Sequence, residues 1–174
     1  MSSLVITLVG PDRPGLVGRV SDVVRQHSGN WLESRMAHLA GQFAGIVLVD
    51  VADEHADALA AALNGLTQQG LKLIVERDVV LSSSSSTVGS LVSLNVVGSD
   101  RPGIVREVTQ VLTASQVNVE EFTTHCSAAP MSGGRIFKVE AQLRLPDRLT
   151  LQQLRNKLEA VANDLMVDIS LKSE

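Results

Sequence analysis

The chain of 174 residues is 44% hydrophobic and carries a formal net charge of −4 at pH 7, which is typical of a globular protein. It has no cluster of lysine and arginine, so direct binding to DNA or RNA is disfavoured. The single cysteine excludes an internal disulfide, and no apolar run reaches the roughly 18 residues of a membrane-spanning helix. We therefore expect a cytoplasmic protein without a membrane segment.

The first predicted element is a strand over residues 4–9, which is mostly apolar on both faces, as in a central strand. The hexapeptide GPDRPG at 10–15 ends this strand, and Pro14 has the fixed φ that suits the first turn of a helix. Apolar residues then recur at helical spacing as far as His27, and Gly29 is a predicted left-handed C-cap. The turn is thereby expected to present backbone N–H groups at the positive end of a helix, which is a natural anion site.

The next sixty residues predict two strands, a helix and a closing strand. Asp53 is the expected N-cap of that helix, and Gly70 is placed to end it. The expected ranges are 31–39, 43–51, 54–69 and 71–80. The order of elements is therefore βαββαβ.

The hexapeptide recurs 88 positions later, as GSDRPG at 98–103. Between residues 9–33 and 97–121, eleven of twenty-five aligned positions are identical, whereas chance would give roughly one or two. This internal duplication predicts a second βαββαβ unit. Its strands are expected at 91–97, 119–127, 135–145 and 166–171, with a helix after Pro102 and another after a capping box at Thr150–Gln153.

We therefore expect an α+β protein with two tandem ferredoxin-like βαββαβ domains, at residues 1–81 and 88–174. Each domain should contain a four-stranded antiparallel sheet with both helices on one face. Between the domains, residues 82–87 consist of five serines and a threonine, a composition that indicates a flexible linker.

With these turns in place, the chain resembles a tandem ACT-domain protein. ACT domains are small ligand-binding modules that sense amino acids, and their pattern joins a Pro-Gly turn to an Asn that opens the second strand. Both copies fit, because Gly15 precedes Asn30 by 15 residues and Gly103 precedes Asn118 by 15. The chain is also similar to the glycine cleavage system transcriptional repressor family, which consists of two ACT domains, and the resemblance covers nearly everything outside the serine tract.

The resemblance implies an effector held between two domains, against the turn of one and the Asn of the other. It assigns ten ligand-binding residues: Gly10, Asp12, Pro14, Gly15, Asn30, Gly98, Asp100, Pro102, Gly103 and Asn118. Helix-end N–H groups suit a carboxylate, and Asp and Asn oxygens suit an ammonium group. The tight turn favours glycine, alanine or serine, with glycine preferred. Members on metabolic enzymes often carry His-x-Asn where this chain has Gly-x-Asp at 10–12 and 98–100.

Structural roles compete with this interpretation. Pro-Gly turns often serve chain geometry alone, Asp12 and Asp100 can cap a helix, and both Asn residues can satisfy backbone groups at a strand entry. The adjacent His125 and Cys126 fall in a predicted strand and should point to opposite faces, so they cannot form a catalytic pair. We therefore predict no catalytic residue, no metal and no cofactor.

Two functions remain. The first is a non-enzymatic amino-acid sensor that represses the glycine cleavage system indirectly, through contact with a transcription factor. The alternative is a regulatory subunit that docks on an amino-acid-metabolic enzyme. Both need a protein partner, and neither needs nucleic acid or a membrane. Homo-oligomerisation stays open, because each expected sheet has an edge that a second copy can pair with.

Overall fold

The computed structural model describes residues 1–77, 89–130 and 133–173. The chain divides into two compact units, Met1–Ser82 and Ser83–Glu174, and each is described by itself. The serine tract at 82–87 and the predicted strand residues 78–80 lie outside the described residues. The first unit contains β1 (Ser2–Pro11), α1 (Leu16–Gln26), β2 (Asn30–Leu39), β3 (Gln42–Val51), α2 (Asp53–Gly65), the 3-10 helix η1 (Leu66–Gln69) and β4 (Lys72–Arg77). The second contains β5 (Ser90–Ser99), α3 (Ile104–Ala114), β6 (Asn118–Ala128), β7 (Arg135–Leu145), α4 (Leu151–Leu165) and β8 (Val167–Ser173).

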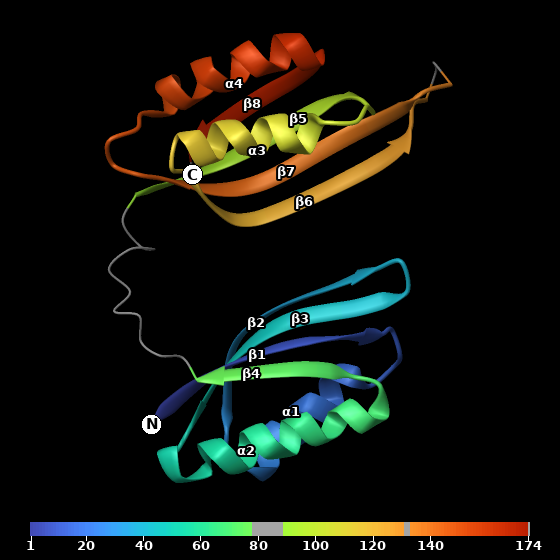
Figure 1. Cartoon of the computed structure of the whole chain (residues 1–174), viewed down its shortest axis with the longest axis vertical. Coiled ribbons are helices and arrows are strands. Elements are labelled where there is room, and N and C mark those ends of the chain that lie inside the picture. Colours follow the sequence, from blue (N-terminus) through green and yellow to red (C-terminus); the bar gives the residue numbers. More distant parts are fainter. Residues whose placement is uncertain (78–88, 131–132, 174) are drawn as a thin grey trace. The chain divides into compact units, whose positions relative to one another are not determined.

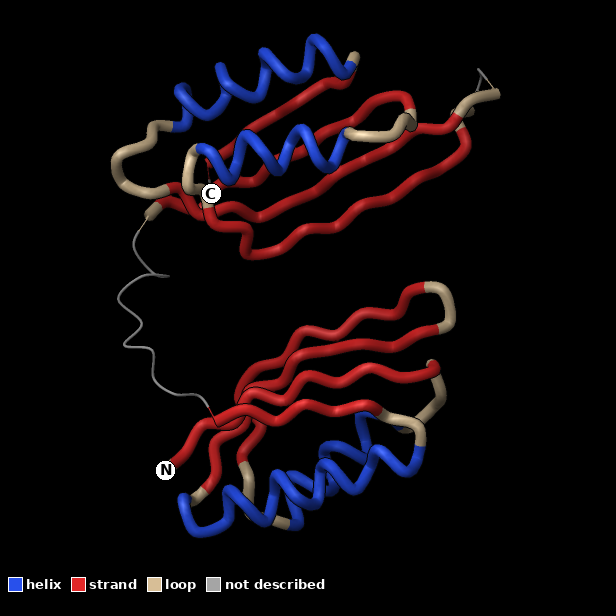
Figure 2. The backbone as a smooth tube through the Cα atoms, in the orientation of Figure 1, coloured by secondary structure: helices blue, strands red, loops and turns tan. Residues whose placement is uncertain are grey.

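Each unit has one four-stranded antiparallel sheet with its two helices on the same face (Figure 2). The strand orders are β2-β3-β1-β4 and β6-β7-β5-β8, so the duplicated strands β1 and β5 are both central. The predicted α+β class and the ferredoxin-like order of each copy are therefore confirmed.

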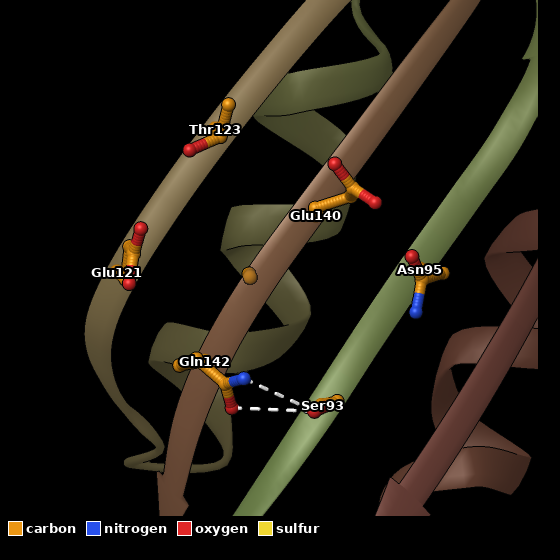
Figure 3. A pocket seen from close by; sticks show the side chains of 7 residues that line it. Ser93, Asn95, Glu121, Thr123, Glu140 and Gln142 are labelled. Carbon is orange, nitrogen blue, oxygen red and sulfur yellow. Dashed lines mark hydrogen bonds between the residues drawn. The ribbon is translucent and has the colours of Figure 1, made fainter. Parts of the chain in front are cut away.

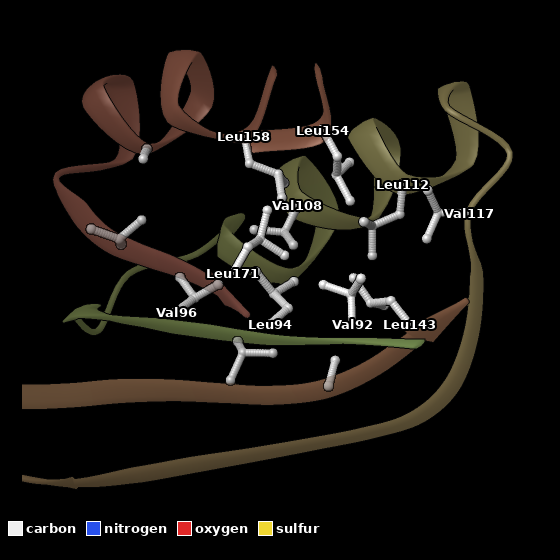
Figure 4. Packing of buried hydrophobic residues seen from close by; sticks show 14 of the residues in the cluster. Val92, Leu94, Val96, Val108, Leu112, Val117, Leu143, Leu154, Leu158 and Leu171 are labelled. Carbon is white, nitrogen blue, oxygen red and sulfur yellow. The ribbon is translucent and has the colours of Figure 1, made fainter. Parts of the chain in front are cut away.

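Alternation along the central strands places one set of side chains under the helices. Leu4, Ile6 and Leu8 of β1 are at most 1% exposed, and Val92, Leu94 and Val96 occupy the same positions in β5 (Figure 4). The opposite set faces away from the helices, on what we call the open face of each sheet. The two-residue period of a strand produces this separation.

Three local predictions between residues 28 and 70 were wrong. The left-handed residue after α1 is Ser28, with φ 57°, and Gly29 is required for a different reason, because a Cβ there would lie 2.9 Å from Val24 Cγ1. Asp53 is the first residue of α2 rather than its N-cap, and the N-cap is Ala52. The single helix expected at 54–69 is α2 followed by η1, which ends at Gly70 as expected, with φ 89°.

Other local predictions were confirmed. The capping box of α4 is formed on both sides, since Thr150 Oγ1 accepts from the N–H of Gln153 at 3.2 Å and Gln153 Oε1 accepts from the N–H of Thr150 at 2.9 Å. Among the described residues, no helix has the length and apolar character that crossing a bilayer requires.

Candidate functional site

The two Asp-Arg-Pro-Gly turns have nearly the same backbone. Gly15 has φ 86° and ψ 6°, and Gly103 has φ 102° and ψ −15°, close to the third position of a type II turn, where Pro is favoured one residue earlier. The helices begin at the next residue, so Pro14 and Pro102 precede them and do not lie in the first helical turn as the sequence had suggested. The glycines are needed for their positive φ.

Each turn leaves the start of its helix open. Gly15 and Gly103 are the N-caps of α1 and α3, and neither helix start has a side-chain cap hydrogen bond from its N-cap residue. Asp12 and Asp100 therefore do not cap the helices. A Cβ added at Gly15 or Gly103 would meet no atom within 4 Å, so the surface beside each turn is unobstructed within its own domain. Both turns can offer backbone donors to an anion.

The two aspartates instead bind the hairpin next to their turn. The Asp12 N–H donates to Gly41 O at 2.9 Å, and Asp12 Oδ2 lies 3.5 Å from His38 Nε2. The Asp100 N–H donates to Arg135 O at 2.8 Å, and its Oδ2 lies 3.7 Å from Arg135 Nε. Both contacts lie at or near the surface, and the one to His38 is an ion pair only when the imidazole is protonated. Such contacts contribute little to stability, so the carboxylates can exchange them for a ligand's ammonium group at little cost.

Gly10 and Gly98 have a packing role that is sufficient to explain them. A Cβ at Gly10 would lie 2.9 Å from Gly70 O, and one at Gly98 would lie 2.5 Å from Val167 Cγ1. In both domains the chain that enters the last strand passes directly over this glycine. These two residues shape the turn region, and the structure gives them no direct part in holding a ligand.

Asn30 and Asn118 lie at the other end of their sheets from the turns. Asn30 pairs with Asp50, which pairs with Ser3, whereas Gly10 pairs with Phe43. Gly10 lies seven positions after Ser3 in β1, which corresponds to about 23 Å along a strand. One ACT-like unit therefore cannot bring its own turn and its own Asn to the same small ligand, and the same register holds in the second unit.

Asn118 also has a local partner. Its Nδ2 donates to Glu120 Oε1 at 3.0 Å, and the same carboxylate oxygen accepts from Arg144 Nε at 2.9 Å. Glu120 sits where the β6–β7 register shifts, between Val119 and Glu121. A ligand that used Asn118 would have to share its side chain with this cluster.

A polar hollow on the open face of the second sheet was not predicted from the sequence. It has a volume of about 320 Å³, and its polar lining comes from β5, β6 and β7 (Figure 3): Ser93, Asn95, Glu121, Thr123, Glu140 and Gln142. Ser93 Oγ and the Gln142 amide are hydrogen-bonded at 3.2 and 3.3 Å, and Lys138 Nζ donates to Glu140 at 2.6 Å. Hydroxyl, amide and carboxylate groups can hold a small polar molecule with a cationic end. Its signal in the sequence was the polar residue Ser93, where the first copy has Val5.

Two further observations concern metal-ligating side chains and the His125–Cys126 pair. In that part of the chain, no group of three or more His, Cys, Asp or Glu side chains is arranged to hold a metal ion. His125 pairs with Lys138 and Cys126 with Phe137, so these two neighbours lie on opposite faces of β6, as alternation requires.

Comparison with known proteins agrees with this geometry. ACT-domain family models match residues 2–76 and residues 90–165. A UPF0237 protein of Methanococcus maripaludis is 36% identical over 81 residues, covering 45% of this chain and 90% of the relative. A UPF0237 protein of Methanopyrus kandleri is 32% identical over 85 residues, covering 46% of this chain and 92% of the relative. Both relatives have the length of about one of the two units.

Two crystal structures match the whole chain. A protein of unknown function from Galdieria sulphuraria is 32% identical, with a TM-score of 0.88, and the match covers 99% of this chain and 98% of that one. A candidate glycine cleavage system transcriptional repressor is 25% identical, with a TM-score of 0.73, and the match covers 99% and 97%. The chain is thus similar over its full length to proteins of the same two-unit organisation. It belongs to the ACT-domain family and carries two ACT domains in tandem.

Proposed function

We propose that this ACT protein is a non-enzymatic amino-acid sensor that represses the glycine cleavage system indirectly, by contacting a transcription factor. The observation that carries the proposal is the Asp-Arg-Pro-Gly turn, which both domains present with the same backbone and an open helix end. Full-length similarity to a candidate repressor of that system supports the regulatory role.

The proposed ligand is a small α-amino acid, with glycine favoured. Its carboxylate would accept from the N–H groups that begin α1 or α3, because these lack a side-chain cap. Its ammonium group would replace His38 or Arg135 beside Asp12 or Asp100. Among small amino acids such as glycine, alanine and serine, glycine is favoured because the chain is similar over its full length to a candidate repressor of the glycine cleavage system.

In the proposed site, the Asn residue belongs to a different domain from the turn. Since a turn and the Asn of the same domain lie at opposite ends of the sheet, a site that uses both residue types needs two ACT domains. The duplication supplies the full motif, with its turn and its Asn, in both domains of the chain.

Repression through protein contact fits the charge of the chain. A net charge of −4 without a basic cluster does not provide the phosphate contacts on which DNA binding depends.

The open face of the first sheet carries apolar side chains, among them Ile46 at 54% and Ile74 at 61% exposure, and exposed apolar surface suits contact with another protein.

Thermal unfolding tests the ligand. Glycine at 100 times its Kd should add about 2.7 kcal/mol to the stability of the folded state, so the domain that binds it should melt several degrees higher. The double variant Asn30→Ala with Asn118→Ala should lose this shift while keeping its fold. The matched control is Asn64→Ala with Asn163→Ala, which removes two exposed amides from helices and should keep the shift. If glycine, alanine and serine all leave the melting unchanged, the sensor function is excluded.

Capture from lysate tests the partner. Tagged protein with and without glycine should retain a transcription factor in a glycine-dependent amount. Retention of an amino-acid-metabolic enzyme instead would favour the docking-subunit function, which the ACT fold supports equally well.

A further inference from the structure

The second domain has a pocket away from its turn, between the end of α3 and the start of α4. Its volume is about 310 Å³, at the lower end of the roughly 300–1,000 Å³ of small-molecule sites. The residues that line it are Ala114, Ser115, Arg148, Leu149, Gln153 and Lys157. Nothing in the proposed amino-acid site uses these residues.

The lining is cationic, although the protein as a whole is acidic. Arg148 and Lys157 both contribute to it, and no carboxylate does, in a chain with a net charge of −4. Gln153 adds an amide whose Oε1 is already held by the N–H of Thr150 at 2.9 Å, so its NH₂ group is the end that can donate to a ligand. All three long side chains therefore offer N–H donors to the same space.

A buried hydroxyl fixes one of these cations. Lys157 Nζ donates to Ser115 Oγ at 3.2 Å, and Ser115, at 7% exposure, is the one polar residue buried among those that the structure describes. The ammonium group is thereby held against Ser115, which also lines the pocket, and its other two hydrogens are left to donate. The positive end of α4 begins beside the same space, since Thr150 is its N-cap, and it favours an anion there.

We propose that this pocket binds a small phosphate monoester. The planar guanidinium of Arg148, the fixed ammonium group of Lys157 and the amide of Gln153 together offer several N–H donors. These donors match the several acceptor oxygens of a phosphate group better than the two of a carboxylate. Ala114 and Leu149 give the organic part of the molecule an apolar contact. The volume leaves room for that part beside the phosphate.

The first domain provides an internal comparison. Its residue at the position of Ser115 is His27, whose Nδ1 lies 3.0 Å from Val23 O. The first turn of α2 carries the acidic residues Asp53 and Glu54, whereas the first turn of α4 carries none. The duplicated scaffold therefore has an anion-attracting pocket at this end in one copy and an anion-repelling end in the other.

A competing role for Lys157 is structural, because a cation beside the end of α3 is favourable in itself. Arg148 has no such role, so its substitution separates the two explanations. Arg148→Gln removes an exposed side chain and should not disturb folding.

The test is a titration of the ¹⁵N-labelled full chain, followed by NMR at constant ionic strength. The probes are glycerol 3-phosphate, inorganic phosphate and glycerate. Glycerol 3-phosphate should shift the amide signals of Ser115, Leu149 and Gln153 saturably and bind more tightly than the other two probes. Arg148→Gln and Lys157→Gln should each weaken binding by about tenfold, the loss expected for one charge-assisted contact. Arg106→Gln, which removes an exposed arginine from α3, should leave it unchanged.

Three results would overturn the proposal. The first is a set of signal shifts that sodium chloride reproduces at the same ionic strength. The second is equal binding of glycerol 3-phosphate to the wild type and to Arg148→Gln. The third is binding of another probe as tight as that of glycerol 3-phosphate. Equal binding of glycerate would mean that the phosphate group contributes nothing, and equal binding of inorganic phosphate would mean that the organic part contributes nothing.

Discussion

The two ACT domains share a scaffold but differ on the open faces of their sheets. Under the helices, Ile6 and Leu94 occupy equivalent positions, and both are fully buried. On the open face, the first domain has Val5, Thr7 and Val9 of β1, Ile46 and Leu48 of β3 and Ile74 of β4. The equivalent residues of the second domain are Ser93, Asn95, Val97, Glu140, Gln142 and Ser170. At these six positions the first open face is mainly apolar and the second mainly polar, although Glu33, Arg35, Lys72 and Glu76 border the apolar residues of the first.

This difference separates what the fold needs from what it leaves free. Helix packing requires an apolar inner face in both copies, because that burial stabilises each small domain. Within each unit, the described helices all lie on the inner face, so the residues of the open face can change without loss of helix packing. The first open face suits contact with another apolar surface, and the second suits water or a polar ligand.

The turns also differ in how they are held. In the second domain, the Arg101 guanidinium donates to the carbonyl oxygen of Asp164, which fixes the turn to the end of α4. Asp12 faces His38, whereas Asp100 faces Arg135. A ligand's ammonium group would therefore displace a histidine, which is charged only when protonated, from Asp12, but an arginine from Asp100. If only one turn binds an amino acid, we expect it to be the first, because the contact that the ligand must replace there is the weaker one.

Substitution of the central core residue should have the largest effect. Ile6→Ala and Leu94→Ala should each destabilise their own domain by about 2–5 kcal/mol, because each leaves a cavity in a close-packed core. Trp31 is the only tryptophan and the chain has no tyrosine, so its fluorescence reports urea unfolding of the first domain alone. Ile6→Ala should lower the fluorescence midpoint, whereas Leu94→Ala should lower only a transition seen by circular dichroism. Equal shifts of the fluorescence midpoint would show that the domains unfold as one unit.

The strand-end glycines come next. Gly98→Ala should cost about 1–3 kcal/mol, since its Cβ would lie 2.5 Å from Val167 Cγ1 and 3.0 Å from Met166 O. Gly10→Ala should cost somewhat less, because its nearest contact is 2.9 Å. Urea unfolding followed by circular dichroism measures both. A neutral effect at either position would mean that the last strand moves away without cost, and would reopen a direct role for that glycine at the ligand.

The helix caps test a smaller difference between the domains. Thr150→Ala should cost about 1 kcal/mol by removing the capping box of α4. Ala52, the N-cap of α2, has the extended backbone of a capping residue but no side-chain acceptor. Ala52→Ser should therefore stabilise the first domain, by up to about 1 kcal/mol. Trp31 fluorescence during urea unfolding measures this gain, and a loss of stability would show that the Asp53 carboxylate already serves the helix end.

The smallest effect concerns pH. The hydrogen bond from Ser2 Oγ, 2.6 Å from Asp53 Oδ1, is the main cause that lowers the pKa of this carboxyl below its usual value of 3.8. A carboxyl with a lowered folded-state pKa stabilises the protein above its unfolded pKa, and this contribution disappears as the pH falls through the folded-state pKa. Asp53→Asn should therefore reduce the stability of the first domain at pH 6, and this loss should shrink as the pH falls below 3.8. A loss of stability that stays constant as the pH falls would contradict the role of the charge.

Periodicity and duplication made most of the fold predictable. Strand β7 was expected at 135–145 and is found there, and β1 extends its predicted range by two residues at each end, because alternation and turn residues depend only on neighbours in the chain. The errors at Gly29 and Asp53 arose where two adjacent residues could each take the cap, and tertiary packing decided between them. Spacing alone could not show that Asn30 and Gly15 lie at opposite ends of one domain. The pocket at Arg148 and Lys157 was not predictable either, since it needs a loop and two helices to converge.

Calorimetric titration of glycine into the full chain tests the central claim most directly. The proposed sensor predicts a saturable heat, which Asn30→Ala with Asn118→Ala abolishes and Asn64→Ala with Asn163→Ala preserves. Absence of any binding heat with glycine, alanine and serine would contradict it, and the two Asp-Arg-Pro-Gly turns would then serve only to join each central strand to its helix.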